Sequence, residues 1–236
     1  MTNRDNEIQD MTPDRTLPPD PVFSCPDYGG KMKIRDFKYT PEIVDCRYCT
    51  KFIRGHCRAS GCPWLSERIE AGVVDYHEAL EETFLENTHL RRRVKLVSAC
   101  SNSFWLDEGH QQRFAVAQAI FGIYRKRNTP AYYAAIYLLT SDESLFRRTA
   151  DCVRKKKIDF QFADVRHMTA GQYALYKTAK SLYNGSSEVS VDEFADPTLF
   201  GLDEFKIAVN AMLISRYGLS AVYLSHEDAK HGSMSR

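Results

Sequence analysis

The sequence contains no apolar run of the length that a membrane-spanning helix needs, which is about 18 residues. Its first residues also lack the basic segment followed by an apolar one that marks a secretory signal peptide. We therefore expect a cytoplasmic protein with no membrane partner. In that reducing compartment, closely spaced cysteines favour a metal site over disulfides.

The chain also lacks the motifs of the common enzyme classes. It has no glycine-rich phosphate loop, no G-x-S-x-G nucleophile turn and no dinucleotide-binding fingerprint. Residues 77–81 begin like the metalloprotease helix H-E-x-x-H, but Glu81 stands where the second histidine ligand would be. No residue is therefore assigned a catalytic role, and the sequence indicates neither a small-molecule substrate nor an enzyme.

The net charge is close to zero, yet the charges are unevenly distributed along the chain. The formal net charge is +1. Residues 89–157 carry fourteen Lys and Arg against five Asp and Glu, whereas residues 66–88 carry seven acids against one base. A basic middle segment of this kind can attract nucleic acid, or it can neutralise its acidic flanks within the fold.

Apolar periodicity and capping signals predict a mainly α-helical protein. Thr129 and Pro130 form a helix start before a segment that is apolar on every side, so residues 130–139 should form a buried central helix. Asp107 should cap another helix, and Thr169 and Ser190 each begin a capping box.

The predicted fold is a helical domain preceded by a small zinc-knuckle-like module with at most one or two short strands. We divide the chain into a disordered leader at 1–30, a four-cysteine metal-binding module at 31–64 and linking helices at 65–103. An all-helical domain at 104–224 and a flexible tail at 225–236 follow. A short strand is expected within 31–44, where apolar and charged residues alternate.

The strongest chemical signal is a cysteine cluster with the spacing C-x2-C-x7-C-x4-C. Its four members are Cys46, Cys49, Cys57 and Cys62. Two thiolates separated by two residues can bind one ion, and a second pair completes a tetrahedron, which predicts structural zinc. An iron–sulfur cluster and free thiols are the alternatives. Cys25 is a possible additional ligand, and His56 could replace its neighbour Cys57.

Three basic runs are the predicted nucleic-acid contacts. They comprise Arg91, Arg92 and Arg93, then Arg125, Lys126 and Arg127, and finally Lys155, Lys156 and Lys157 preceded by Arg154. Gathered on one face they would contact phosphates without sequence specificity. The last two runs lie near predicted helix ends, where cations also stabilise a helix dipole, so a purely structural role is the alternative.

Several stretches resemble a family of uncharacterised proteins carried on integrative and conjugative elements of Clostridia and related Firmicutes. The matching stretches are KIRDF at 33–37, DCRYC at 45–49, Gly55 with Cys57, ERIEAG at 67–72, TPAYYAAIYLL at 129–139, IDF at 158–160, YALY at 173–176 and NAMLISRYG at 210–218. They span roughly residues 31–219. The part from Phe104 onward also resembles a phage-associated domain of unknown function. The resemblance implies a genetic context and supplies no activity.

Together these observations predict a zinc-stabilised accessory protein of a mobile element. It would contact DNA, RNA or a protein of the transfer or regulatory machinery. The alternative is an anti-defence protein that inhibits a host restriction or CRISPR nuclease through protein–protein binding, using its acidic helix at 75–86 to mimic phosphate charge.

Overall fold

A computed structural model describes residues 38–226, and within that range the protein is mainly α-helical, as predicted. The predicted leader, Cys25, the first part of the predicted strand and most of the predicted tail lie outside the described residues. In the described part of the predicted strand, residues 38–40 have no regular structure and residues 41–44 form a turn. The two short strands of the described chain are β1 (Phe52–Ile53) and β2 (His56–Cys57), which pair antiparallel.

The helices begin where their capping residues stand. Asp107 caps α4 (Glu108–Phe121), and Thr129 with Pro130 begins α5 (Pro130–Leu139). Capping boxes begin both α7 (Ala170–Asn184) and α8 (Val191–Ala195), as predicted. Each cap satisfies amide groups that the first turn of a helix leaves unpaired.

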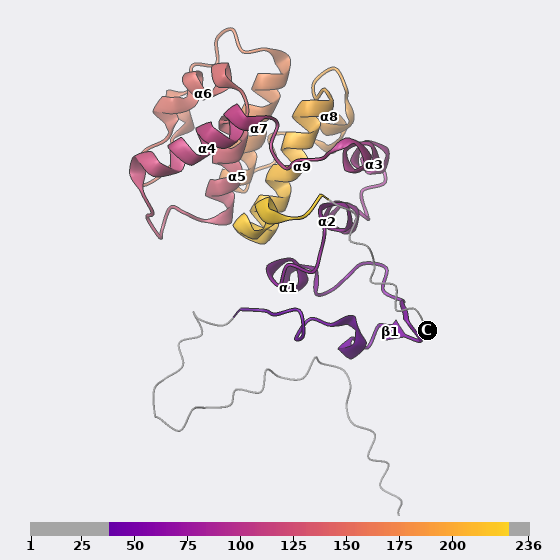
Figure 1. Cartoon of the computed structure of the whole chain (residues 1–236). Coiled ribbons are helices and arrows are strands. Elements are labelled where there is room, and N and C mark those ends of the chain that lie inside the picture. The colour runs from indigo at the N-terminus through magenta and orange to yellow at the C-terminus, as the bar shows by residue number, and fades with distance from the viewer. Residues whose placement is uncertain (1–37, 227–236) are drawn as a thin grey trace, which may run out of the picture.

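The core is built around α5, which lies between α7 and α9 (Leu202–Tyr217) (Figure 1). Every residue from 134 to 139 is at most 1% exposed, so this helix is enclosed on all sides. The side chain of Leu145, on α6 (Glu143–Thr149), is also fully buried. The segment at 221–224 belongs to the 3₁₀ helix η5 (Gly218–Tyr223) that packs on α9.

The helices expected to link the module to the helical domain pack on that domain directly. They are α1 (Leu65–Glu70), α2 (Tyr76–Thr83) and α3 (Arg91–Cys100), and all three contact α9. The amide of Tyr76 donates to the carbonyl of Ser225 at 2.8 Å, which ties α2 to the end of the described chain. The buried core is therefore continuous from Leu65 to Leu224.

A buried asparagine on α9 joins four segments of this core. The Oδ1 atom of Asn210 accepts from the Tyr76 hydroxyl at 2.8 Å, and its Nδ2 atom donates to the Phe104 carbonyl at 2.9 Å. The hydroxyl of Tyr137 donates to the same carbonyl at 2.5 Å. Since an unpaired buried polar group is costly, this network fixes how α2, α5 and α9 pack against one another.

Candidate functional site

The cysteine module, defined as residues 38–64, combines two tight backbone features. Cys46 begins the 3₁₀ turn η2 (Cys46–Tyr48), in which the amide of Cys49 donates to the Cys46 carbonyl at 3.0 Å. The hairpin of β1 and β2 turns at Arg54 and Gly55, whose φ values of +52° and +83° suit a two-residue hairpin loop. The hairpin places Cys57 opposite Phe52, three residues after Cys49.

The four predicted ligands lie in one neighbourhood of the cysteine module. Burial is the main cause that raises the pKa of Cys46, the charge of Arg68 opposes it, and the other three thiols add to the increase. Cys57 is exposed, whereas the other three are half-buried. Within residues 38–226, no three His, Cys, Asp or Glu side chains have the closed arrangement that holds a metal ion. The sulfurs are thus neighbours without forming a finished ligand shell.

Two side chains, Arg68 on α1 and Glu82 on α2, bind Cys62, the last of these cysteines. The Nη1 atom of Arg68 donates to the Cys62 sulfur at 3.8 Å and to the carboxylate of Glu78. The amide of Cys62 donates to Glu82 Oε2 at 2.7 Å. Cys62 and Glu82 also line a pocket of about 660 Å³ that reaches Tyr217 at the end of α9. In Figure 1 the cysteine module lies below the bundle, with α1 and α2 next to it.

The sequence predicted only an acidic helix at 75–86 that could mimic phosphate charge, and it gave no sign of these contacts. In the structure Glu78 binds Arg68 on α1, Glu82 binds the amide of Cys62, and both carboxylates are only partly exposed. Their spacing of four residues puts them on one side of the helix. The spacing cannot show that Arg68 would lie next to Glu78, because this contact depends on the turn between α1 and α2.

Arg93, from the first basic run, is a structural residue. Its guanidinium donates to the carbonyl of Phe194 at 2.7 Å, to that of Phe200 and to that of Gly201 at 3.1 Å, and it lies 4.2 Å from the ring centre of Phe205. Burial lowers its pKa. The guanidinium thus joins α3 to α8 and to the loop between α8 and α9.

Arg127, from the second basic run, is also internal. Its side chain is only 2% exposed, and the guanidinium lies 4.7 Å from the ring centre of Tyr132. It donates to the Gly122 carbonyl at 2.6 Å and to the Lys155 carbonyl at 3.1 Å. The guanidinium groups of Arg93 and Arg127 thus both bind carbonyls within the fold, which gives these two predicted phosphate contacts a structural role.

The same bonds of Arg127 bring the second and third basic runs together. Residues 125–127 form the turn between α4 and α5, and residues 154–157 form a turn closed by the bridge between Val153 and Ile158. We call the exposed cations of these two turns the basic turn pair. Its members are Arg125, Lys126, Arg154, Lys155 and Lys156. Lys157 is exposed as well, but it pairs with Asp159 at 2.6 Å.

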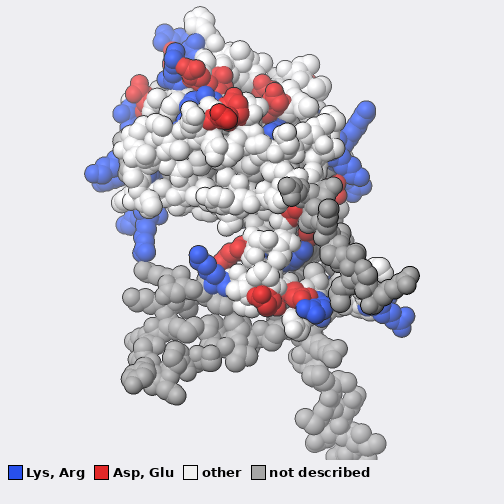
Figure 2. All heavy atoms as spheres, in the orientation of Figure 1, with Lys and Arg blue, Asp and Glu red and all other residues white. Residues whose placement is uncertain are grey.

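The remaining predicted cations, Arg91 and Arg92, lie exposed on α3, which Figure 1 places at the opposite side of the bundle from the turn between α4 and α5. Arg91 donates to the Leu85 carbonyl at 3.3 Å. The three runs thus do not form one continuous field. Figure 2 shows the same separation, with blue side chains at several distinct places around a broad white area.

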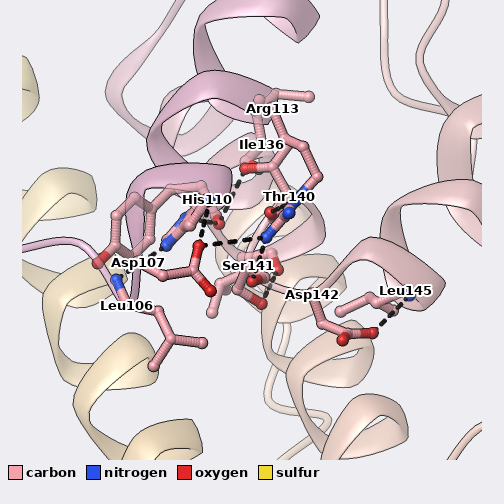
Figure 3. A network of polar contacts seen from close by, with 11 residues as sticks. Leu106, Asp107, His110, Arg113, Ile136, Thr140, Ser141, Asp142 and Leu145 are labelled. Carbon is pink, nitrogen blue, oxygen red and sulfur yellow. Dashed lines mark hydrogen bonds and ion pairs between the residues drawn. The ribbon is translucent and has the colours of Figure 1, made fainter.

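A further cation of the basic middle segment is used to complete a helix end. Arg113 on α4 donates from Nε to the Thr140 carbonyl and from Nη2 to the Ser141 carbonyl, both at 2.8 Å, just after α5 ends (Figure 3). The same guanidinium lies 3.8 Å from Asp107. Cations favour this end of a helix because its last carbonyls are unpaired. Part of the positive charge of this segment, on Arg93, Arg113 and Arg127, therefore serves the fold.

Comparison with known protein families, with curated proteins and with solved structures finds no match to the chain. The resemblance to mobile-element proteins accordingly stays a prediction. Among the described residues, no helix has the length and apolar character needed to cross a membrane.

Proposed function

We propose that the protein is a non-enzymatic binding protein whose cysteine module holds a structural zinc ion and whose basic turn pair contacts the phosphates of nucleic acid. The observation that carries the binding proposal is the buried Arg127, which fixes two basic turns from distant parts of the chain into one surface. Because the fold already holds these two turns together, less conformational entropy is lost when their cations contact a phosphate backbone.

The metal proposal rests on the chemistry of the four thiols. Thiolate sulfur is a preferred zinc ligand, and a tight turn with a two-residue spacing followed by a hairpin is a common way to present such ligands. Cys46, Cys49, Cys57 and Cys62 would hold the ion. Their combined negative charge would be balanced in part by Arg68, whose Nη1 atom already lies 3.8 Å from one of the sulfurs. Four sulfur ligands leave no open position, so the ion would be structural.

The phosphate proposal rests on lysines that are exposed and that the nearby acid of their own turn does not bind. Lys155 and Lys156 are exposed, and they stand at the tip of a turn whose own acid, Asp159, pairs with Lys157. Arg154 lies 4.4 Å from the ring centre of the exposed Phe162, a pairing that offers a flat surface beside the charges. Contacts of this type bind the backbone of DNA or RNA irrespective of sequence.

We infer from the resemblance that this activity serves a mobile genetic element. The inhibitor alternative has less support, because Asp75 caps α2, Glu78 pairs with Arg68 and Glu82 binds the Cys62 amide, so fewer acids of this segment are free to mimic phosphates. The proposed partner is therefore nucleic acid.

The binding proposal is tested by fluorescence anisotropy with a short labelled DNA duplex and a labelled single-stranded RNA at several salt concentrations. We expect the double variant Lys155→Glu, Lys156→Glu to bind at least about tenfold more weakly at low salt. The slope of log affinity against log salt should fall by about two, one for each lost phosphate contact.

The matched control is Arg92→Glu, Lys95→Glu, which makes the same charge change at exposed positions of α3. This control should retain more of the affinity than the test variant. Equal losses in both variants would show that only the net charge matters, and an absence of binding by the unaltered protein at low salt would overturn the nucleic-acid proposal.

A further inference from the structure

The side chain of Phe162 is an exposed aromatic ring close to the basic turn pair. It ends the 3₁₀ helix η4 (Phe160–Phe162) and is 49% exposed, whereas Phe160 at the start of the same turn is only 8% exposed. The carbonyl of Phe160 accepts from the Tyr176 hydroxyl at 3.0 Å, which ties η4 to α7. One ring of this turn is therefore anchored in the core, and the other is held in contact with solvent.

The turn at 154–157 holds its cations next to this exposed ring. The amide of Asp159 donates to the Cys152 carbonyl at 2.8 Å, which closes the turn just before η4 begins. At the start of the turn, the guanidinium of Arg154 lies 4.4 Å from the centre of the Phe162 ring, within the range of a cation–π contact. The ring and the cations of this turn thus form one surface.

The ring of Phe162 also borders an open pocket of about 670 Å³. The other residues of its lining come from α6, from the residues next to that helix and from Asp164. Arg154 does not line this pocket, so the ring meets the pocket on a side that the guanidinium leaves uncovered. A pocket of this volume is large enough for a small ligand. One side of the ring is therefore accessible to a planar group.

Three of the four acids in this pocket are bound within the fold. Asp142 caps α6, and two others, Glu143 and Asp164, pair with arginines. The fourth, Asp151, is exposed, and its side chain forms no hydrogen bond or ion pair with any described residue. An uncommitted carboxylate accepts hydrogen bonds from N–H groups such as the amino group at the edge of a base.

The ring, the carboxylate and the cations together match the chemistry of an unpaired nucleotide. Aromatic rings and arginine guanidinium groups bind bases by stacking, whichever base is present. In a duplex, neighbouring bases cover both faces of each base and the partner strand pairs its edge. A single strand leaves the faces and edges of its bases free for a protein. This surface therefore favours single strands over duplexes.

We propose that Phe162 and the pocket beside it bind an unpaired base of a single-stranded nucleic acid, while the basic turn pair contacts the neighbouring phosphates. In this arrangement the base stacks on the ring, and Asp151 accepts from the amino group of the base. The inference rests on the proposed phosphate contact and names its substrate class, which is single-stranded DNA or RNA in preference to a duplex.

The main test compares three labelled DNA probes of equal length by fluorescence anisotropy at low salt. They are a single strand of mixed sequence, the same strand in a duplex, and a single strand of abasic sites, which keeps the phosphates and lacks the bases. We expect the full chain to bind the base-carrying single strand at least about tenfold more tightly than the abasic strand, because only the former can stack on the ring. The duplex should also bind more weakly than the single strand.

Variants of the ring separate stacking from charge. Phe162→Leu should weaken binding of the base-carrying single strand about tenfold and leave the abasic strand and the duplex unchanged, because leucine is apolar but offers no flat face. The dependence of affinity on salt should stay the same, since no phosphate contact is lost. Phe162→Tyr keeps a ring and should retain the affinity. The control Tyr223→Leu removes a ring that is 86% exposed on η5 and should have no effect.

A further measurement tests the role of the carboxylate. Cytosine carries an amino group at its edge and thymine does not, so Asp151→Ala should lower the ratio of the affinity for a cytosine strand to that for a thymine strand by about threefold. The ratio cancels the general effect of removing a negative charge. An unchanged ratio would show that Asp151 does not contact the base.

An abasic strand that binds as tightly as the base-carrying strand would overturn the inference. So would a Phe162→Leu variant that binds the single strand normally, or one that loses affinity equally for all three probes. In each of these cases the phosphate contact would still stand if Lys155→Glu, Lys156→Glu weakened binding. Absence of binding to every probe would overturn the proposed function and this inference together.

Discussion

The cysteine module and the helical body of this protein are held together by different means. No residue between 38 and 64 is buried, whereas residues 134–139 of α5 are almost completely shielded from solvent. The helical body can therefore draw its stability from burying apolar surface, about 25 cal/mol for each Å². The module has no such source, so its structure must depend on local hydrogen bonds, on its contacts with α1 and α2, and on the metal that we propose.

The largest effect that would test this contrast is loss of the proposed metal. Cys49→Ser should reduce bound zinc from about one ion per chain to none, because the ion would lose a ligand. Structural zinc stabilises finger peptides by roughly 10 to 16 kcal/mol, so the module should lose its structure while the helical body keeps its unfolding temperature. Elemental analysis measures the zinc, and hydrogen exchange of residues 45–64 measures the structure.

The control for this variant is Cys100→Ser, which removes an exposed thiol at the end of α3 and should change neither result. Zinc that stays bound in Cys49→Ser, or an unaltered protein without zinc, would contradict the metal proposal. Simultaneous unfolding of both regions in the variant would contradict the contrast between them.

An effect of intermediate size should appear in the helical body alone when the pH is lowered. His110 on α4 is fully buried. Its Nδ1 atom accepts from the Leu106 amide at 3.3 Å, so Nε2 carries the hydrogen that is donated to the Tyr137 carbonyl at 2.9 Å. Burial is the main cause that lowers its pKa to about 4. The Tyr137 carbonyl and Asp107 oppose this, and Arg113 and Lys206 add to it.

The sign of the pH effect follows from this lowered pKa. Between pH 6.5, the ordinary value, and about 4, the unfolded chain binds a proton at His110 that the folded chain does not. The contribution of neutral His110 to the free energy of unfolding is therefore complete above pH 6.5. It is lost as the pH falls towards 4, by an amount on the order of 3 kcal/mol. Urea unfolding at several pH values should show His110→Gln to be less sensitive in this window than the unaltered protein.

The exposed His89 provides the control for the pH experiment, since His89→Gln should keep the full pH dependence. An identical pH profile for His110→Gln and the unaltered protein would show that other groups cause the acid sensitivity. If the cysteine module lost its structure over the same pH range as the helical body, the two regions would unfold together.

The smallest effect should come from the contact between the two regions. Arg68→Met removes the hydrogen bonds to Cys62 and Glu78 and should cost about 1 kcal/mol, because the pair is partly solvated. Zinc should stay bound, while hydrogen exchange near Cys62 should become faster. The control Arg147→Met breaks an exposed pair with Glu143 and should have almost no effect. Equal effects of the two variants would show that Arg68 does not join the regions.

Much of the fold could be predicted because helix starts depend on neighbours in the sequence. Thr169 and Gln172 form a capping box within four residues, and Gly185 ends α7 in the left-handed conformation that glycine permits. The burial of α5 could be predicted equally well, because a helix that is apolar on every side has no polar face for contact with water. The cysteine cluster belongs to this class too, as its spacing is a local property.

The basic residues show where such reasoning stops. Arg125 and Arg127 have the same side chain and lie two positions apart, yet Arg125 is exposed and Arg127 is buried between Gly122 and Lys155. Whether an arginine meets water or a carbonyl depends on which distant segment passes beside it. The same is true of Asn210, whose four-way role requires α2, the loop at Phe104 and α5 to meet.

The amino-acid sequence by itself determined the mainly helical class, the helix starts and the grouping of four cysteines, because each follows from residues within one or two turns of chain. Only the tertiary structure decided which charges are used inside the fold, that Glu78 meets Arg68 and Glu82 meets Cys62, and that Val116 and Ile120 of α4 stay exposed. These properties depend on the packing of α4, α5 and α9 and on the contacts between distant segments, which no local pattern encodes.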